Sequence, residues 1–161
     1  PENRKTQGFV KNFTNASNMA LASMNRFCSK GFVNARKIYD NCMYYTGEMN
    51  LHPAEPNYLT ESLSGGNAQK VIIAKWMTTD ADIIIFDEPT KGIDVGAKAE
   101  IYRLMEDLVA GGKAIIMVSS ELPEVIGMSD RVVVMREGKI MGFLNHDELN
   151  EEVIMSFAMG G

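Results

Sequence analysis

The sequence predicts an α/β fold with a parallel sheet. Residues 81–161 alternate short apolar runs with stretches of helical periodicity, which is typical of parallel strands joined by helices. The run Ile83–Phe86 is short and strongly β-forming, as expected of a strand buried on both faces of such a sheet. Asp87 and Glu88 follow this run directly. Because ligands bind at the carboxyl ends of parallel strands, this strand end is a candidate site.

The first part of the chain is predicted to be helical. Apolar residues recur at helical spacing from about Asn15 to Met49 and predict two helices joined by a loop at Lys30 and Gly31. Residues 50–61 contain two prolines and should be irregular. A third helix should begin at Ser64. The predicted apolar faces of the first two helices contain Met19, Leu21, Ala22, Met24 and Phe27, followed by Val33, Ile38 and Met43.

The second part supplies the remaining strands and helices. The predicted elements are a helix over 97–109 ended by Gly111 and Gly112, a strand over 114–118, a short helix near 123–128, a strand over 131–135, a turn over 136–139, a strand over 140–143 and a helix over 147–159. The last two strands should form an antiparallel hairpin at the edge of the sheet. Acidic residues early in the final helix suit its dipole.

Composition narrows the class of protein. The chain has 161 residues, 45% of them hydrophobic and 23% charged, which suits one globular unit. Its net charge of −5 argues against a nucleic-acid partner, and its longest apolar runs are far below the roughly 20 residues that span a bilayer. Cys28 and Cys42 lack the spacing of a metal site and form no disulfide framework, which favours reduced thiols.

Two motifs suggest phosphate chemistry. Two adjacent carboxylates at a strand end suit phosphoryl transfer, with Asp87 holding Mg²⁺ through its water shell and Glu88 polarising the attacking water. Ser64 and the two glycines after it open a helix whose N–H groups can hold a phosphate. Each motif also has an ordinary interpretation, namely a solvated strand end and a simple N-cap.

The order of four motifs resembles the ATP-binding subunits of ABC transporters over nearly the whole chain. The motifs are Leu63-Ser64-Gly65-Gly66, Asp87-Glu88-Pro89-Thr90, Gly92-Ile93-Asp94 and Val118-Ser119-Ser120-Glu121. Within that family, residues 1–5, 92–98 and 119–125 look like the second, C-terminal nucleotide-binding domain of bacterial ribose, galactose and related simple-sugar importers. In those proteins two such domains lie in tandem on one polypeptide.

The resemblance implies ATP and Mg²⁺ as cofactors and assigns roles to particular residues. The signature residues, which contact the γ-phosphate of a nucleotide held by the opposite domain, are Ser64, Gly65, Gly66 and Asn67. Asp87 matches the Walker B aspartate, which holds Mg²⁺ through water, and Glu88 matches the catalytic glutamate. Asp94 matches the D-loop aspartate, which communicates across the dimer interface.

Three departures from the family pattern affect the site. Ser120 stands where the switch histidine is expected, and a hydroxyl cannot take up positive charge or reach the γ-phosphate as an imidazole can. Glu2 stands in the region of the Q-loop glutamine. No Gly-x-x-x-x-Gly-Lys-Ser/Thr occurs in the chain, so no Walker A phosphate loop is present. The chain is therefore expected to be a fragment, truncated before its Q-loop region and inactive on its own.

The fold implied by the resemblance is a partial P-loop NTPase core that lacks the Walker A strand, with a helical signature subdomain. Residues 1–80 would hold the Q-loop-like segment, the helical subdomain and the signature helix. Residues 81–161 would hold the Walker B, D-loop and switch-loop part of the core, followed by the hairpin and the last helix.

The resemblance implies ATP binding and hydrolysis that energises the import of a simple sugar. The implied partners are the other nucleotide-binding domain, membrane permease subunits and, indirectly, a periplasmic or extracellular sugar-binding protein, at the cytoplasmic face of a bacterial membrane. An alternative is a non-hydrolysing domain that donates its signature and docks the permease. A soluble ABC ATPase of DNA repair or translation is disfavoured, because the chain shows neither long insertions nor strongly basic segments.

Overall fold

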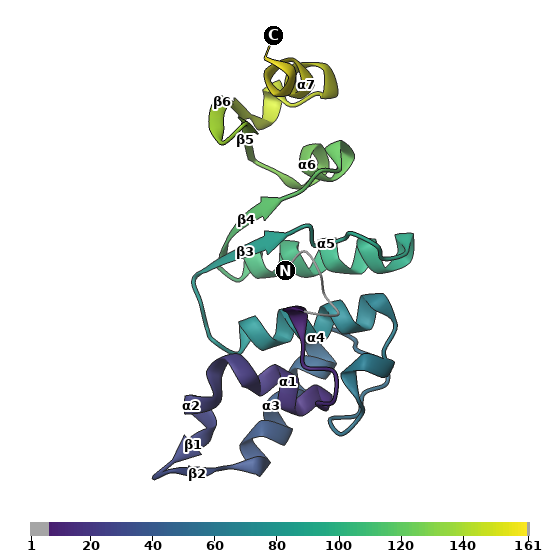
Figure 1. Ribbon diagram of the computed structural model, residues 1–161, viewed down its shortest axis with the longest axis vertical. Coiled ribbons are helices and arrows are strands. Elements are labelled where there is room, and N and C mark those ends of the chain that lie inside the picture. Colours follow the sequence, from purple (N-terminus) through teal and green to yellow (C-terminus); the bar gives the residue numbers. More distant parts are fainter. Residues whose placement is uncertain (1–6, 161) are drawn as a thin grey trace. The chain divides into compact units, whose positions relative to one another are not determined.

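The computed structural model describes residues 7–160 (Figure 1). The backbone divides into two compact units, with the boundary between Ile116 and Met117. The functional division predicted between residues 80 and 81 is based on motifs rather than packing, and it stays a prediction. No helix in the described part of the chain is long and apolar enough to cross a membrane.

The first unit begins with short helical segments and ends in a strand–helix–strand arrangement. Its elements are α1 (Asn15–Ala20), η2 (Leu21–Ser23), α2 (Met24–Phe27), β1 (Cys28–Ser29), β2 (Phe32–Val33), α3 (Ala35–Glu48), η3 (Thr60–Ser62), α4 (Gly65–Met77), β3 (Ile83–Asp87), α5 (Val95–Ala110) and β4 (Ala114–Val118). The helices at 35–48 and 65–77 and the irregular segment before η3 confirm the prediction.

The first predicted helix is broken. A 3₁₀ turn separates α1 from α2, and β1 pairs with β2 in a short hairpin whose turn holds Lys30 and Gly31, both at positive φ. Met19 and Phe27 are buried as predicted, but Leu21 and Val33 are exposed, which makes the predicted apolar face wrong there. A 3₁₀ turn has three residues per turn rather than 3.6, so it rotates later side chains away from the original face.

Buried amides hold α1 against the chain that leads into α4. The side chain of Asn18 accepts a hydrogen bond from the amide of Val10 at 2.8 Å. It donates to the carbonyls of Val10 and Phe13 and to the hydroxyl of Thr60, at 3.1, 3.3 and 3.0 Å. Because both Asn18 and Thr60 are fully buried, every one of these bonds replaces a lost bond to water.

The network continues through Asn15, which is also fully buried. Its side-chain oxygen accepts from the Thr60 hydroxyl at 3.0 Å, and its amide nitrogen donates to the carbonyl of Glu55 at 3.1 Å. Residues far apart in sequence are thereby joined into one polar cluster (Asn15, Asn18 and Thr60). This cluster fixes the irregular segment just before the start of α4.

Strands β3 and β4 form a two-stranded sheet joined through α5. The amide of Ala114, at the start of β4, donates to the carbonyl of Asp82, just before the start of β3, at 2.9 Å. Adjacent starting ends mean that the strands run in the same direction, which confirms the predicted parallel pairing. Gly111 and Gly112 end α5 as predicted, with Gly112 at φ 88°.

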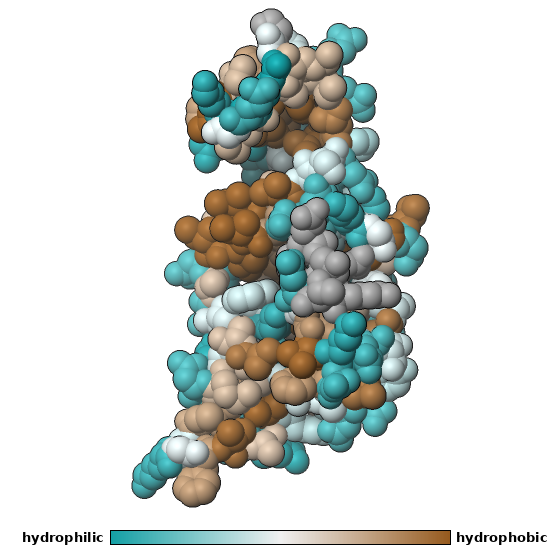
Figure 2. Space-filling view, in the orientation of Figure 1, coloured by the Kyte–Doolittle hydropathy of each residue, from teal (hydrophilic) through white to brown (hydrophobic). Residues whose placement is uncertain are grey.

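The expectation that the strand at 83–86 is buried on both faces is wrong. Phe86 is buried, but Ile83 and Ile85 are 61% and 68% exposed, and Ile116 on β4 is also exposed. Figure 2 shows an apolar patch over this part of the sheet. Side chains alternate between faces along a strand, and α5 covers only one of the two faces within the first unit (Figure 1).

The second unit contains a hairpin flanked by helices. Its elements after β4 are α6 (Leu122–Met128), β5 (Arg131–Arg136), β6 (Lys139–Asn145), η4 (His146–Glu148) and α7 (Glu151–Met159). The antiparallel pairing of β5 with β6 confirms the prediction, although in the described part of the chain the two strands form a sheet of their own rather than a sheet edge. Val132, Val134, Leu144 and Ile154 form its core.

Replacing Asn18 with alanine should lower the free energy of unfolding by roughly 2–4 kcal/mol, because several buried groups lose their partner at once. Chemical unfolding of the chain measures this value. Asn25→Ala on α2 is the matched control, since Asn25 is exposed and its loss should change stability little. Equal effects of the two substitutions would contradict the role assigned to the polar cluster.

Cys42 should resist alkylation while Cys28 reacts. Burial raises the pKa of the Cys42 thiol to about 11, against a smaller opposite effect of its hydrogen bond with Thr46, whereas Cys28 is exposed. At pH 8 only about one Cys42 thiol in 1,000 is then a thiolate, the reactive form. Mass spectrometry after iodoacetamide treatment should show one label on the folded chain and two in denaturant. Two labels on the folded chain would contradict this expectation.

Candidate functional site

The N-terminus of α4 is exposed and capped by its own residues. The Ser64 hydroxyl accepts from the backbone amide of Asn67 at 3.4 Å and from its side-chain amide at 3.0 Å. The Asn67 side-chain oxygen accepts from the amide of His52 at 2.9 Å, which fixes the side chain. The first turn carries no acidic residue, while Ser64 and Gly65 are exposed. The first turn of this 13-residue helix therefore contributes no carboxylate to the positive end of the helix dipole.

Gly66 lies against α5. A Cβ placed on Gly66 would stand 2.6 Å from the Cβ of Ala97, which is closer than a Cβ comes to a non-bonded atom in proteins. One helical turn further along α4, the Lys70 ammonium lies 2.8 Å from a carboxylate oxygen of Glu100 and donates to the carbonyl of Asn50 at 2.9 Å. The start of α4 is thus held closely to the start of α5.

The end of β3 makes a tight turn. Asp87 is exposed, and Glu88, which is half-buried, has φ 47° in the left-handed region. Glutamate rarely takes this conformation, and such strain concentrates at functional sites. The turn is held by a hydrogen bond from the amide of Lys91 to the Glu88 carbonyl at 3.3 Å and by the burial of Thr90. Asp87 and Glu88 are therefore presented by a defined backbone rather than by a frayed strand end.

Asp94 is the N-cap of α5. Its carboxylate accepts a hydrogen bond from the amide of Ala97 at 2.9 Å. This bond satisfies one of the first-turn N–H groups that have no partner within the helix. An aspartate immediately before a helical stretch signals such a cap in a sequence, whereas the family resemblance gives Asp94 only a role across a dimer interface.

The Ser120 segment lies in the second unit. Ser120 is exposed, and the neighbouring Ser119 hydroxyl donates to the buried carboxylate of Glu124 while accepting from the amide of Glu121 at 3.0 Å. Glu124 thus anchors the segment that carries Ser120. Glu124 lies in the 119–125 stretch that carries the family resemblance, but the sequence predicts no role for it, because a contact over five residues follows neither helical nor strand periodicity.

The structure brings the signature residues beside the helix that begins at Asp94. Within the described residues, no group of three or more histidines, cysteines, aspartates or glutamates is arranged to hold a metal ion. Glu2, the Q-loop-like residue, lies outside the described residues. The roles predicted for these side chains stay predictions.

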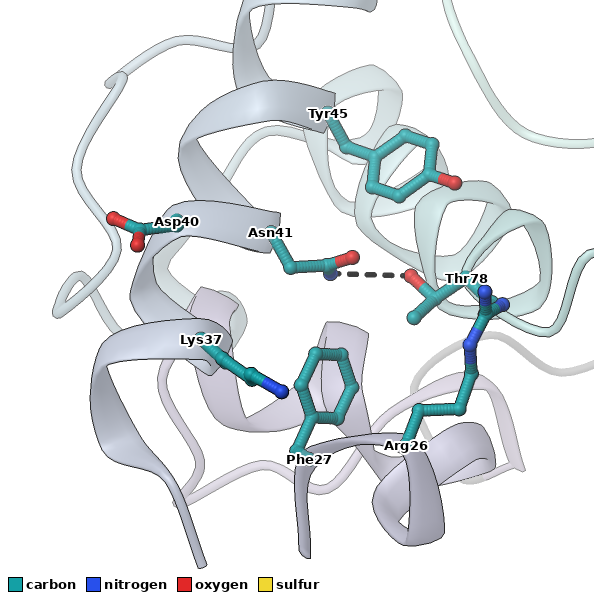
Figure 3. Close-up of a pocket in the computed structure, with 7 residues that line it drawn as sticks. All are labelled: Arg26, Phe27, Lys37, Asp40, Asn41, Tyr45 and Thr78. Carbon is teal, nitrogen blue, oxygen red and sulfur yellow. Dashed lines mark hydrogen bonds between the residues drawn. The ribbon is translucent and has the colours of Figure 1, made fainter.

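A separate hollow lies among the helices of the first unit (Figure 3). Its lining includes Arg26, Tyr45 and Thr78, and Asn41 donates to the Thr78 hydroxyl at 3.2 Å. Arg26 also donates to the Thr78 carbonyl, and burial raises the pKa of the Tyr45 phenol. None of the candidate site residues predicted from the sequence is among its lining residues, so it is distinct from the phosphate-binding candidates.

Curated relatives are similar along the whole chain. The ribose import ATP-binding protein RbsA of Oceanobacillus iheyensis is 47% identical over 160 residues, and that of Halalkalibacterium halodurans is 48% identical over 162. Each alignment covers 99% of this chain but 32% of the relative. The chain therefore spans about a third of the length of these relatives.

Solved structures share the fold. The ATP-binding cassette MJ1267 of an ABC transporter superposes with a TM-score of 0.76 at 21% identity, covering 91% of this chain and 63% of the cassette. The dimeric bacterial ABC transporter cassette MJ0796 gives 0.71 at 21% identity, covering 86% and 59%. The α/β fold is thus that of an ABC ATPase cassette, present in part. The ABC transporter family model also matches residues 2–91, more than half of the sequence, and the chain therefore belongs to the ABC transporter family.

Proposed function

We propose that this chain is part of an ATPase subunit that drives the import of a simple sugar, corresponding to the second nucleotide-binding domain of a ribose- or galactose-type importer. The observation that carries the proposal is the N-terminus of α4, where Ser64 and Gly65 are exposed and the first turn carries no acidic residue. The similarity to ribose import ATP-binding proteins supports this class of cargo. A sugar is selected by other components, so the particular sugar is left open.

The residues present fit ATP as a ligand of this helix end. Exposed Ser64 and Gly65 let an anion approach the first turn, and the helix dipole favours negative charge there. The Asn67 side chain, fixed by His52 and Ser64, lies beside this end. In this proposal, as the family resemblance implies, the nucleotide that meets Ser64 and Gly65 is held by the phosphate loop of the opposite domain. The signature would then act in trans.

In this proposal, the residues at the end of β3 hold Mg²⁺ and activate the attacking water. Mg²⁺ usually keeps several waters and takes one or two protein carboxylates, which the exposed Asp87 can supply. When bound, the ion neutralises charge on the phosphates. Glu88, which directly follows β3 with a left-handed backbone, polarises the attacking water. Asp94 keeps its capping bond to α5 while facing the partner domain.

Ser120 distinguishes two versions of the proposal. In the first, this domain hydrolyses ATP slowly because a hydroxyl at Ser120 supplies no positive charge. In the second, the domain does not hydrolyse ATP at all, donates its signature to the opposite site and docks the permease. The presence of Glu88 in a strained, held turn favours the first version.

The partners in the proposal are a second nucleotide-binding domain, permease subunits in the membrane and a sugar-binding protein that acts through the permease. The domain would lie at the cytoplasmic face of the membrane as a peripheral component. The net charge of −5 suits these partners better than nucleic acid.

Glu88→Gln in the full-length ATPase should lower the turnover of ATP at this domain by roughly 100-fold or more, because the amide cannot take up a proton from the attacking water. Steady-state phosphate release and sugar uptake measure the effect. Glu106→Gln is the matched control, an exposed glutamate on α5 whose replacement should change neither. Unchanged uptake with Glu88→Gln would favour the non-hydrolysing version, and an absence of ATP turnover in the parent protein would overturn the proposal.

Ser120→His should raise turnover at this domain by about tenfold, since an imidazole can donate to the γ-phosphate and carry positive charge. Phosphate release is again the measurement, made in a protein whose opposite site is blocked. Ser129→His, in the same unit and outside the motif, serves as the control for an added imidazole. No gain from Ser120→His would contradict the explanation of slow turnover by the missing histidine.

A further inference from the structure

Two contacts hold the start of α4 against the start of α5. They lie about one helical turn apart, on the same face of each helix. The first is between Gly66 and Ala97, and the second is the ion pair of Lys70 with Glu100. Lys70 follows Gly66 by four residues and Glu100 follows Ala97 by three, which are the spacings of neighbours on one helix face. Both contacts therefore belong to one line of packing.

The order of the contacts shows that the two helices run in the same direction, as Figure 1 also shows. Their N-termini consequently lie at the same end of the packing line. One N-terminus carries the signature cap, Ser64, and the other carries the D-loop cap, Asp94. The helix packing thus sets the distance between two motifs that are 30 residues apart in the sequence.

The contact at Gly66 leaves no room for adjustment. The neighbouring atom is the Cβ of Ala97, which is attached to the backbone and cannot move aside by rotation. A Cβ on Gly66 would stand 2.6 Å from that atom but 3.9 Å from the Ala97 Cα, which is an ordinary contact. One methyl group therefore fits at this crossing and two do not.

The side chain of Lys70 also holds α4 and α5 at this distance. Its side chain is 6% exposed, so the cost of its desolvation must be met by partners. Glu100 supplies the charge at 2.8 Å, and the Asn50 carbonyl supplies a second bond at 2.9 Å. A shift of α5 away from α4 would leave a buried ammonium without its counter-charge, which is strongly unfavourable.

We propose that Ala97 and Glu100 are positioning residues for the signature, holding α4 and α5 as one body so that Ser64–Gly66 and Asp94 meet the opposite domain together. Gly66 then lacks a side chain because of α5 within its own domain, in addition to any approach of a nucleotide. This inference rests on the proposed function.

The test is a compensating pair of substitutions in the full-length ATPase. Gly66→Ala should lower the kcat of ATP hydrolysis by about tenfold or more, because α4 and α5 are forced apart. Ala97→Gly in the same protein should restore kcat to within about threefold of the parent, because one methyl group again occupies the crossing. Ala97→Gly alone should lower kcat by less than Gly66→Ala does, because it leaves a gap at the crossing rather than an overlap of two methyl groups.

A helical glycine with open space provides the matched control. Gly47→Ala on α3 meets no atom within 4 Å, so it should leave kcat unchanged. Glu100→Ala should lower kcat with little change in KM, and Glu100→Gln, which keeps an acceptor for Lys70, should recover part of it. The same variants of the 161-residue chain are also compared by thermal unfolding, where Gly66→Ala should lower the Tm and Ala97→Gly should restore it.

The outcomes separate this inference from the proposed function. If the double variant hydrolyses ATP as poorly as Gly66→Ala alone, Gly66 serves only the nucleotide and the inference is wrong. Parent-like activity of Gly66→Ala would also overturn it. If the parent protein shows no hydrolysis, the proposed function fails, while the unfolding comparison still decides whether Gly66 and Ala97 set the spacing. Recovery of folding by the double variant, where Gly66→Ala does not fold, supports the inference.

Discussion

Helix α4 is buried along most of its length, and the bonds that its buried lysines require hold the neighbouring segments of the chain in place. Residues 68–75 are all buried, and two of them are lysines. A buried ammonium must be paired or hydrogen-bonded, so each lysine fastens a neighbouring part of the chain to the helix. Lys70 fastens α5 and the loop at Asn50, and Lys75 donates to the carbonyl of Gly8 at 2.6 Å. Burial also lowers the pKa of the Lys75 ammonium.

A second set of buried polar groups prepares the entrance to α4. The polar cluster of Asn15, Asn18 and Thr60 satisfies backbone groups that an irregular segment would otherwise leave unpaired. The segment has no regular hydrogen-bond ladder of its own, so these side chains supply the bonds instead. The result is that Ser64 stands at a defined place without a strand or helix before it. A conventional apolar core could not have fixed such a loop, because apolar contacts have no direction.

Much of this arrangement follows from local sequence. The starts of α4 and α5 follow from Ser64 and Asp94, whose side chains bond the amides three residues on. The end of α5 follows from Gly112, which takes a positive φ, and the strands at 83–87 and 114–118 follow from short apolar runs. The break after Ala20 does not follow, since apolar spacing alone continues through it. A 3₁₀ turn costs little and is chosen by the packing around it.

The order of the motifs was enough to identify the family and to name candidate site residues, because N-caps, strand ends and glycine pairs are properties of a few neighbouring residues. The tertiary structure decided what those residues touch. It placed Gly66 against Ala97 and Lys70 against Glu100, gave Glu88 a left-handed backbone, and left Ile83 and Ile85 exposed. These features depend on residues distant in the sequence, and no local pattern records how closely two helices approach or whether a sheet face is covered. Local sequence thus determined the helix caps, strand ends and candidate site residues, whereas tertiary packing decided the distances between them.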